Sequence, residues 1–392
     1  MKKIKIGVVI PSFFPATVYG GPIFSSLHTC EALAAIDGVK VLVSTTTANK
    51  TETLDVQPNV WHRLARHFYV KYYSELIVGK VSLSLLVGLW KDIKRTNVLH
   101  VQSIFSVSTP IALVYAKLLG KPVLLSPRGQ LADWSMSQGS RLKSFWLTLL
   151  ILPFAKRIVW HATSQTERSD ILSLVQDADV RVVTNGIETL TFMQTNNLSR
   201  NEYMSRFAKV SCHPSNILVS MGRIHKVKGF DILIKAFAVI EKQLNESCLL
   251  IAGKDDGELT TLMTLVKQME LDDCVFFVGE LSGQDKVDFL ANADLFVLPS
   301  HTENFGNVYI ESLATGTPII ASENTPWEEV EEADCGRWVN NSVEETADAM
   351  TNMLRADKKR MRENARKFSE KFDWKNIAIE FKNVFEEMVE KV

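Results

Sequence analysis

The sequence predicts two doubly wound α/β domains, each built on a mostly parallel sheet with helices on both faces. Short, nearly continuous apolar runs alternate with helical patterns, as expected of strands buried on both faces. This alternation occurs twice along the chain, and 392 residues suit two domains of ordinary size. Hydrophobic residues make up 46% of the chain and charged residues 23%, which is typical of globular proteins and argues against disorder.

Ten segments have the pattern of buried strands, five in each half of the chain. The first five cover residues 4–10, 39–45, 97–103, 122–127 and 157–164. The second five cover residues 216–223, 248–254, 274–280, 294–300 and 317–322. Helical patterns lie between the strands, for example at 230–244 and 259–269.

The domain boundaries follow from where this pattern stops. We expect a first domain over residues 1–190 and a second over 214–372, with the polar, strand-free stretch 191–213 as a linker. The last segment, 373–392, has apolar residues at the spacing of one helix face. We expect this C-terminal helix to pack back on the first domain.

Charge is divided unevenly between the two halves. Residues 1–190 contain 21 Lys and Arg against 12 Asp and Glu, whereas the rest of the chain contains 23 against 33. The basic half is expected to face an anionic partner, such as a phosphorylated substrate or anionic lipid. We do not expect nucleic acid as a partner, because the basic half has no motif of that kind.

Cysteines and apolar runs indicate the compartment. The five cysteines are scattered and form no CxxC pair, which argues against a disulfide framework and a thiolate zinc site. The apolar run 6–10 after the basic start is short for a signal peptide and ends at Pro11, so we interpret it as a first strand. No run reaches the roughly 18–20 residues of a membrane span. These features predict a cytoplasmic protein.

Two glycines follow the first predicted strand. Gly20 and Gly21 stand just before the helical pattern that begins at Ile23. A glycine pair lets backbone NH groups at the positive end of a helix approach a phosphate closely. A tight turn between strand and helix would explain the same pair equally well.

Two cations lie in the loop after the strand at 216–223. Gly222-Arg223 and Lys228-Gly229 place a guanidinium and an ammonium five residues apart. An arginine fork and a lysine point charge in one loop can grip a diphosphate. The alternative is that both are ordinary solvated cations.

Two glutamates follow the strand at 294–300. Glu303 and Glu311 are separated by seven residues, and Phe305-Gly306-Asn307 lie between them at the expected start of a helix. Open α/β sheets bind ligands at the carboxyl ends of their strands, and NH groups at a helix start bind phosphate. Carboxylates in this place suit sugar hydroxyls. The alternative is that they are surface glutamates that stabilise the first turn of the helix.

Together, these motifs resemble those of the retaining GT-B glycosyltransferases of family 4. The resemblance rests on Arg223, Lys228 and the Glu303-x7-Glu311 pattern, with the Gly-Gly loop after the first strand, and it extends to the entry of the last helix at 372–374. It implies two Rossmann-like domains that face each other across a cleft. The nucleotide-sugar donor would be held mainly by the second domain.

The resemblance implies a role for each motif. Arg223 and Lys228 would neutralise the leaving diphosphate, and the leaving phosphate would accept the proton of the acceptor, without a protein nucleophile. Glu303 would hold a hydroxyl of the transferred sugar. The remaining donor contacts would come from Gly20, Gly21, Gly222, Leu281, Phe305, Gly306, Asn307 and Glu311, with the ribose on Glu311 and the base near Leu281. No metal or other cofactor is implied, and the Asp-Asp pairs at 255–256 and 272–273 are interpreted as loop residues.

One departure from the family pattern concerns the first domain. Many relatives carry a histidine at the end of a first-domain strand, where this chain has Ser126-Pro127-Arg128-Gly129-Gln130. That segment is similar to a subgroup of bacterial surface-polysaccharide transferases, and it implies that Arg128 approaches the donor from the acceptor side. For His100 and His161, a structural hydrogen-bonding role is at least as well supported. His301 is a weaker candidate for the cleft.

Basic and aromatic residues gather in two segments of the first domain. Residues 61–95 hold seven Lys and Arg against two acids, among six Trp, Tyr and Phe residues, and residues 134–157 hold four basic residues and no acid. Such a composition fits an interfacial membrane surface, where a polyprenyl-diphosphate-linked or other glycan acceptor would be available. Core helices with solvated basic faces fit equally well.

The leading hypothesis is therefore a glycosyltransferase of bacterial surface-polysaccharide or lipopolysaccharide O-antigen biosynthesis. A nucleotide-sugar-binding scaffold on the same fold is the alternative from a different class. A sugar-nucleotide epimerase, which would act on the donor without an acceptor, is a further alternative.

Overall fold

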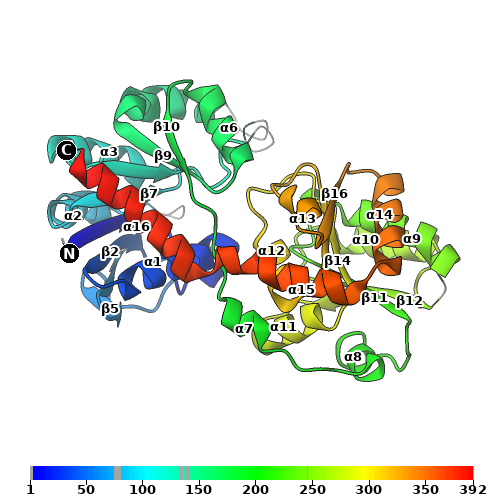
Figure 1. Ribbon diagram of the computed structural model, residues 1–392. Coiled ribbons are helices and arrows are strands. Elements are labelled where there is room, and N and C mark those ends of the chain that lie inside the picture. The colour runs from blue at the N-terminus through cyan, green and yellow to red at the C-terminus, as the bar shows by residue number, and fades with distance from the viewer. Residues whose placement is uncertain (1–2, 75–80, 133–135, 137–140, 245, 392) are drawn as a thin grey trace. The chain divides into compact units, whose positions relative to one another are not determined.

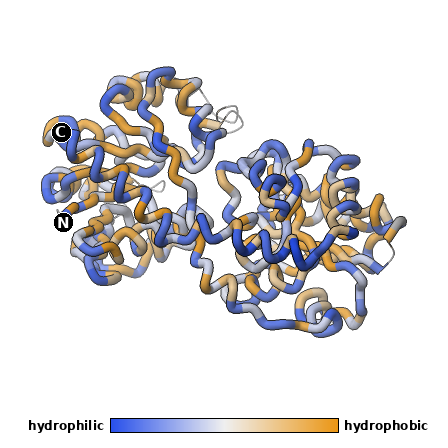
Figure 2. The backbone as a smooth tube through the Cα atoms, in the orientation of Figure 1, coloured by the Kyte–Doolittle hydropathy of each residue, from blue (hydrophilic) through white to orange (hydrophobic). Residues whose placement is uncertain are grey.

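The computed structural model describes residues 3–74, 81–132, 136, 141–244 and 246–391 (Figure 1). The chain divides into two compact units. Unit 1 comprises Met1–Gly186 and Trp374–Val392, and unit 2 comprises Ile187–Asp373. The chain passes between the units twice, and the strands inside each unit are mostly hydrophobic (Figure 2).

Unit 1 contains an eight-stranded sheet in the order β10-β9-β8-β7-β1-β2-β6-β5. All neighbours pair in parallel except β5 and β6, which form an antiparallel hairpin. The chain order reverses between β1 and β7, so the switch point of this sheet lies between those strands. The strands are β1 (Ile4–Val9), β2 (Val39–Thr46), β5 (Trp61–Ala65), β6 (Phe68–Tyr73), β7 (Val98–Gln102), β8 (Val123–Ser126), β9 (Ile158–Ala162) and β10 (Asp179–Val182), with a small separate ladder of β3 (Ala48–Asn49) and β4 (Glu52–Thr53).

Helices cover both faces of this sheet. The helices α1 (Gly21–Ala35) and α16 (Trp374–Glu390) pack together on one face and share one core. The other face is covered by α2 (Leu83–Lys94), α3 (Ser108–Leu118) and the continuous run α5–η2–η3 (141–157). The helix α6 (Gln165–Leu174) follows β9. No helix in the described part of the chain is both long enough and apolar enough to span a membrane.

Unit 2 contains a six-stranded parallel sheet in the order β13-β12-β11-β14-β15-β16. Its switch point lies between β11 and β14, where the chain order reverses. The strands are β11 (Asn216–Met221), β12 (Ser247–Ala252), β13 (Val275–Gly279), β14 (Leu295–Leu298), β15 (Ile319–Ser322) and β16 (Gly336–Val339). The helices are α7 (Thr189–Met193), α8 (Arg200–Phe207), α9 (Phe230–Leu244), α10 (Leu259–Gln268), α11 (Gly283–Ala291), α12 (Asn307–Thr315), α13 (Glu329–Glu332), α14 (Val343–Arg355) and α15 (Lys358–Ser369), with the short turns η4 (Lys226–Lys228) and η5 (Glu370–Phe372).

All ten predicted strands are present, and both units have the predicted α/β architecture. The hydrophobic pattern missed β5, β6, β10 and β16, and also the two-residue strands β3 and β4. β10 and β16 are four-residue strands at sheet edges, and each carries an arginine that breaks the apolar run. β6 was missed because its sequence is aromatic and basic, although Phe68, Tyr72 and Tyr73 are buried in the sheet. This burial removes three of the six aromatic residues from the membrane surface predicted over 61–95.

The segment 191–213, predicted as a linker, folds as part of unit 2. Phe192 of α7 and Tyr203 of α8 are buried in the core of that unit. Asn196 donates from its backbone and its amide to the buried carboxylate of Asp288, at 3.0 and 2.8 Å. The polar side chain of Asn196, in the stretch that suggested an open linker, is therefore satisfied by a buried partner in the unit.

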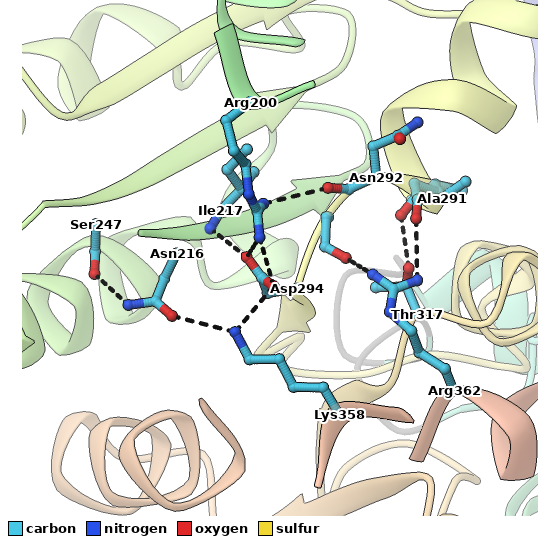
Figure 3. Close-up of polar contacts among 12 residues, drawn as sticks. Arg200, Asn216, Ile217, Ser247, Ala291, Asn292, Asp294, Thr317, Lys358 and Arg362 are labelled. Carbon is cyan, nitrogen blue, oxygen red and sulfur yellow. Dashed lines mark hydrogen bonds and ion pairs between the residues drawn. The ribbon is translucent and has the colours of Figure 1, made fainter. Parts of the chain in front are cut away.

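A buried carboxylate also anchors α8 and α15 at the amino ends of the unit 2 strands (Figure 3). Asp294 accepts from the backbone NH of Ile217 at 2.8 Å, and Arg200 and Lys358 lie 2.7 and 3.0 Å from its oxygens. Burial acts to raise the pKa of Asp294, but the hydrogen bond and charge of Arg200 outweigh it, so the pKa is lowered. This polar cluster occupies one edge of the sheet and leaves the opposite, carboxyl edge for ligands.

Candidate active site

The carboxyl edge of the unit 2 sheet brings two predicted motifs together at the switch point. One loop follows β11 and contains Arg223 and Lys228, and the other follows β14 and contains Glu303. Gly229 has a φ of 65°, and a Cβ there would lie 2.0 Å from the carbonyl oxygen of Pro299. Only glycine therefore allows the two loops to approach so closely. The backbone NH of His301 also donates to Val227 across this contact, at 2.8 Å.

Lys228 and Glu303 form an ion pair between these loops. Their side chains are only 15% and 12% exposed, so the pair is largely shielded from water. Ser300 donates to the same carboxylate oxygen at 3.0 Å. The pair places one separable positive and one separable negative charge at the point where a parallel sheet binds its ligands.

A second ion pair lies beside the helix that follows. Glu311 is one turn into α12, and its carboxylate lies 2.7 Å from Lys286 of α11. Lys286 also lies over the ring of Phe192, 5.4 Å from its centre. The side chains of the pair are 25% and 18% exposed. Glu311 is therefore held by the packing of α11 against α12, and not only by its place in the sequence.

The start of α12 depends on Gly306. This residue has a φ of 77°, and a Cβ would meet the ring of Tyr309 at 2.7 Å. The helix begins at Asn307, so its first NH groups lie at the carboxyl edge of the sheet. The Phe305 side chain is buried against Trp327, with the ring centres 5.1 Å apart, so only its backbone can contact a ligand.

The remaining predicted residues of unit 2 lie around this edge. Gly222 directly follows β11, and its Cα faces the methylene groups of Lys228. Arg223 is 64% exposed and lies 2.5 Å from Asp256, which belongs to the Asp-Asp pair interpreted as loop residues. Leu281 follows β13 and packs partly buried against the unit core.

The predicted residues of unit 1 lie at the carboxyl edge of the other sheet. Gly20 has a φ of 72° and caps α1, and Gly21 is the first residue of that helix. Arg128 follows β8 with a φ of 59°, a strained conformation for a residue with a side chain. Its guanidinium donates to Gln102 at 3.0 Å and to Asn185 at 3.3 Å. Gly20, Gly21 and Arg128 all belong to unit 1.

His100 and His161 form a buried hydrogen-bonded chain through Ser126. His161 donates through Nε2 to the carbonyl oxygen of Val183 at 2.8 Å, so its Nδ1 accepts from Ser126 Oγ at 2.7 Å. Ser126 Oγ in turn accepts from His100 Nε2 at 2.7 Å. Burial lowers the pKa of His161 to about 3, aided by the charge of Arg128, and burial also lowers the pKa of His100. Both rings are neutral and structural in this arrangement.

Sequence reasoning missed the partners of the predicted residues. Lys286 pairs with Glu311, Asp256 with Arg223, and Ser300 with Glu303. No sequence pattern indicated Lys286, because its pairing with Glu311 depends on how α11 and α12 pack. Ser300 ends one predicted strand and Asp256 closely follows another, so their position at the carboxyl edge was a usable signal.

Comparison with known proteins assigns the fold. The chain superposes on the crystal structure of Anabaena HepE in complex with UDP and glucose with a TM-score of 0.73, at 17% identity, covering 98% of this chain and all of that one. The fold is GT-B. Residues 204–368, within the unit that carries the two ion pairs, match the family model described as "Glycosyl transferases group 1".

Similar sequences match part of this GT-B chain. Mannosylfructose-phosphate synthase of Agrobacterium fabrum is 31% identical over 150 residues, which is 36% of this chain and 32% of that protein. Alpha-monoglucosyldiacylglycerol synthase of Streptococcus pneumoniae is 26% identical over 233 residues, 59% of this chain and 52% of that protein. The chain thus matches between about a third and about half of the length of these relatives.

Proposed function

We propose that the protein is a retaining glycosyltransferase of family 4 that transfers a sugar from a nucleotide-sugar donor to a glycan acceptor. The observation that carries the proposal is the pair Lys228–Glu303 at the switch point of unit 2. A diphosphate needs a shielded cation, and a sugar hydroxyl needs a nearby carboxylate. The segment matched to the glycosyltransferase family model contains both residues.

The donor would bind along the carboxyl edge of the unit 2 sheet. Lys228 would contact the diphosphate from one side and Arg223 from the solvent side. The backbone NH groups of Phe305, Gly306 and Asn307, at the entry to α12, would add hydrogen bonds to phosphate and sugar. Glu311 would hold the ribose hydroxyls, and the base would lie near Leu281.

The chemical step would use charge stabilisation and positioning. The bond between the anomeric carbon and the diphosphate oxygen breaks, and negative charge grows on the phosphate that Lys228 and Arg223 face. The acceptor hydroxyl attacks from the same face, and its proton passes to the leaving phosphate. Glu303 orients the sugar during this step, and neither a protein nucleophile nor a metal takes part in the proposal.

The predicted residues of unit 1 would also contact the donor. Gly20 and Gly21 at the start of α1 would offer backbone NH groups to the donor phosphate. Arg128 would contact the donor from the acceptor side. Its strained backbone and two side-chain hydrogen bonds fix the guanidinium, which is the preorganisation that such a contact needs.

The acceptor would be a lipid-linked glycan of surface-polysaccharide or lipopolysaccharide O-antigen assembly, reached from the cytoplasmic face of the membrane. The segment Ser126 to Gln130 supports this subgroup by its resemblance to bacterial surface-polysaccharide transferases. The similarity to a synthase named for a glucosylated diacylglycerol also favours a lipid-bearing acceptor.

A ligand screen tests the donor part of the proposal. We expect UDP-, GDP- or ADP-sugars of one nucleotide series to raise the melting temperature without added metal, because binding to the native state stabilises it. Lys228→Ala should abolish the shift, whereas Lys235→Ala, which removes an exposed lysine paired with Asp231, should preserve it. A wild-type protein that no nucleotide sugar stabilises contradicts the proposal. Conversion of the donor to a new sugar nucleotide without any acceptor would identify an epimerase instead.

A further inference from the structure

One face of unit 1 is unusually hydrophobic for a surface. Three helical segments cover that face of the sheet, and we call them the α2–α3 layer: α2, α3 and residues 141–157 (Figure 1). Eight of the 17 exposed large hydrophobic residues in the described part of the chain belong to this layer. They are Leu83, Val87, Trp90, Val114, Leu118, Leu142, Phe145 and Leu149.

These side chains are arranged in stripes on the outer side of each segment. On α2 they fall at positions 83, 87 and 90, on α3 at 114 and 118, and in the third segment at 142, 145 and 149. Spacings of three, four and seven residues place side chains on one face of a helix. Val87 is 75% exposed and Leu118 66%, although the opposite sides of the same helices are buried in the core.

The three segments are in contact with one another, so the stripes form one surface. Trp90 of α2 meets Tyr115 of α3 edge to face, with the ring centres 5.3 Å apart. Lys117 of α3 lies over the ring of Phe154, 5.9 Å from its centre. Contiguous exposed apolar surface on a soluble unit marks an interaction site.

The charge of this layer selects the partner. Its exposed charged residues in the described structure are all cations: Lys91, Lys94, Lys117, Lys156 and Arg157. Asp92 is the one acidic residue in these three segments, and it is buried. It accepts from Ser44 at 2.9 Å and from Tyr73 at 2.5 Å, so its charge is directed into the unit. A protein partner would complement this positively charged surface only if it were itself acidic. Anionic lipid supplies both an apolar interior and negative headgroups.

We propose that the α2–α3 layer docks on an anionic lipid membrane, with its apolar stripes inserted at the level of the headgroups. This layer retains α2 from the predicted segment 61–95 and residues 141–157 from the predicted segment 134–157, and it adds α3. It leaves out β5 and β6, which belong to the sheet, and Lys71 pairs inward with Asp92 at 3.5 Å. Residues 75–80, 134–135 and 137–140 of the predicted segments lie outside the described residues. The inference deepens the lipid-linked acceptor of the proposed function, but binding to lipid requires no nucleotide sugar.

Vesicle cosedimentation tests this docking. The wild-type protein should sediment with vesicles of phosphatidylcholine containing 30% phosphatidylglycerol at low salt, and release from them at 0.5 M salt. It should bind pure phosphatidylcholine vesicles at least about tenfold more weakly, because each surface cation contributes roughly 1 kcal/mol on anionic lipid. Equal partition onto both vesicle types, or none onto either, overturns the proposal.

Two double variants separate the apolar and the charged contributions. V87S/L118S and K94Q/K117Q should each lower partition onto the anionic vesicles about tenfold, since each removes exposed side chains from this layer. All four side chains are exposed, so the circular dichroism spectrum and the melting temperature should be unchanged. M263S removes an exposed hydrophobic residue of unit 2 and should leave partition unchanged.

Two outcomes contradict the inference. One is a loss of binding in M263S as large as in V87S/L118S. The other is a dimer in sedimentation velocity that V87S/L118S dissolves while vesicle binding persists, which would assign the layer to a second copy of the chain. Because no nucleotide sugar is added, a failed donor screen leaves this test intact, and a failed vesicle test leaves the donor site intact.

Discussion

The two sheets have the same kind of switch point but different polar contacts across it. In unit 2, the loops after β11 and β14 meet through the shielded ion pair Lys228–Glu303. In unit 1, the corresponding point between β1 and β7 is bridged by a neutral hydrogen bond of 2.6 Å from Ser26 to Gln102. Arg128, in the loop after β8, donates to the amide oxygens of Gln102 and Asn185.

Because of this difference, we expect the two edges to contact a ligand in different ways. An ion pair can exchange partners, because a ligand with both a diphosphate and hydroxyl groups can satisfy the lysine and the carboxylate separately. The guanidinium of Arg128 is instead held by hydrogen bonds to neutral amide oxygens, and the charge of the buried Glu167 carboxylate also acts on it. Both edges lie where parallel sheets bind ligands, and under the proposed function the ion pair of unit 2 would open to the donor while the hydrogen-bonded Arg128 of unit 1 would keep its place.

Breaking the ion pair of unit 2 should produce the largest effect, and it should change two quantities in opposite directions: diphosphate binding should become tighter and sugar transfer slower. In Glu303→Gln, Lys228 no longer has a competing carboxylate, so a nucleoside diphosphate should bind about tenfold more tightly. Sugar transfer should fall about 10²- to 10³-fold, because the sugar loses its carboxylate contact. Titration calorimetry with UDP and GDP, beside transfer assays with the donor found by the screen, measures both.

A matched variant makes this test specific. Asp231→Asn removes a carboxylate from a lysine at 3.2 Å in the same unit, but at an exposed position on α9. It should change neither quantity by more than about twofold. Weaker diphosphate binding in Glu303→Gln would show that the carboxylate does not compete with the ligand for Lys228.

The comparison also predicts that mild acid weakens unit 1 before unit 2. The pKa of His161 is lowered to about 3 by burial, whereas a histidine in an unfolded chain titrates near 6.5. Below pH 6.5 the unfolded chain therefore binds more protons than the folded one, and the free energy of unfolding decreases by up to about 1.4 kcal/mol per pH unit. In unit 2, the lowered pKa values of Asp288 and Asp294 remove stability only below about pH 4.

Urea unfolding at pH 7 and pH 5 measures this difference, with hydrogen exchange in β9 and β11 reporting the units separately. His161→Gln should flatten the pH dependence of unit 1, even if its stability at pH 7 is lower. His213→Gln, at an exposed position of unit 2, should leave the pH dependence of unit 1 unchanged. A wild-type unit 1 as stable at pH 5 as at pH 7 would contradict a buried neutral His161.

The sequence predicted what depends on local pattern and missed what depends on packing. Buried strands such as β1 and β12 consist mainly of aliphatic residues, so their pattern identified them. β6 has the same buried role with aromatic and basic residues, and only its pairing with β2 and β5 reveals it. Glu303 and Glu311 were found because both follow one strand at a recognisable spacing. Their lysine partners come from other elements, and for Lys286 no local signal exists.

Substitution of Lys286, the lysine of the unit 2 ion pairs that the sequence did not predict, should have the smallest effect of these variants. If Lys286 orients the Glu311 carboxylate toward the ribose, Lys286→Met should weaken UDP binding about three- to fivefold, within the range for one partly exposed ion pair. Binding of 2′,3′-dideoxy-UDP should change much less, so the preference for the ribonucleotide should decrease, and Lys286→Arg should restore it in part. A uniform loss for both nucleotides, at an unchanged ratio, would mean that Lys286 only supports the packing of α11 on α12. A decreased preference for UDP over the dideoxy nucleotide would indicate that the pair Lys286–Glu311 contributes to recognition of the ribose, beside the contribution of Lys228–Glu303 to the diphosphate.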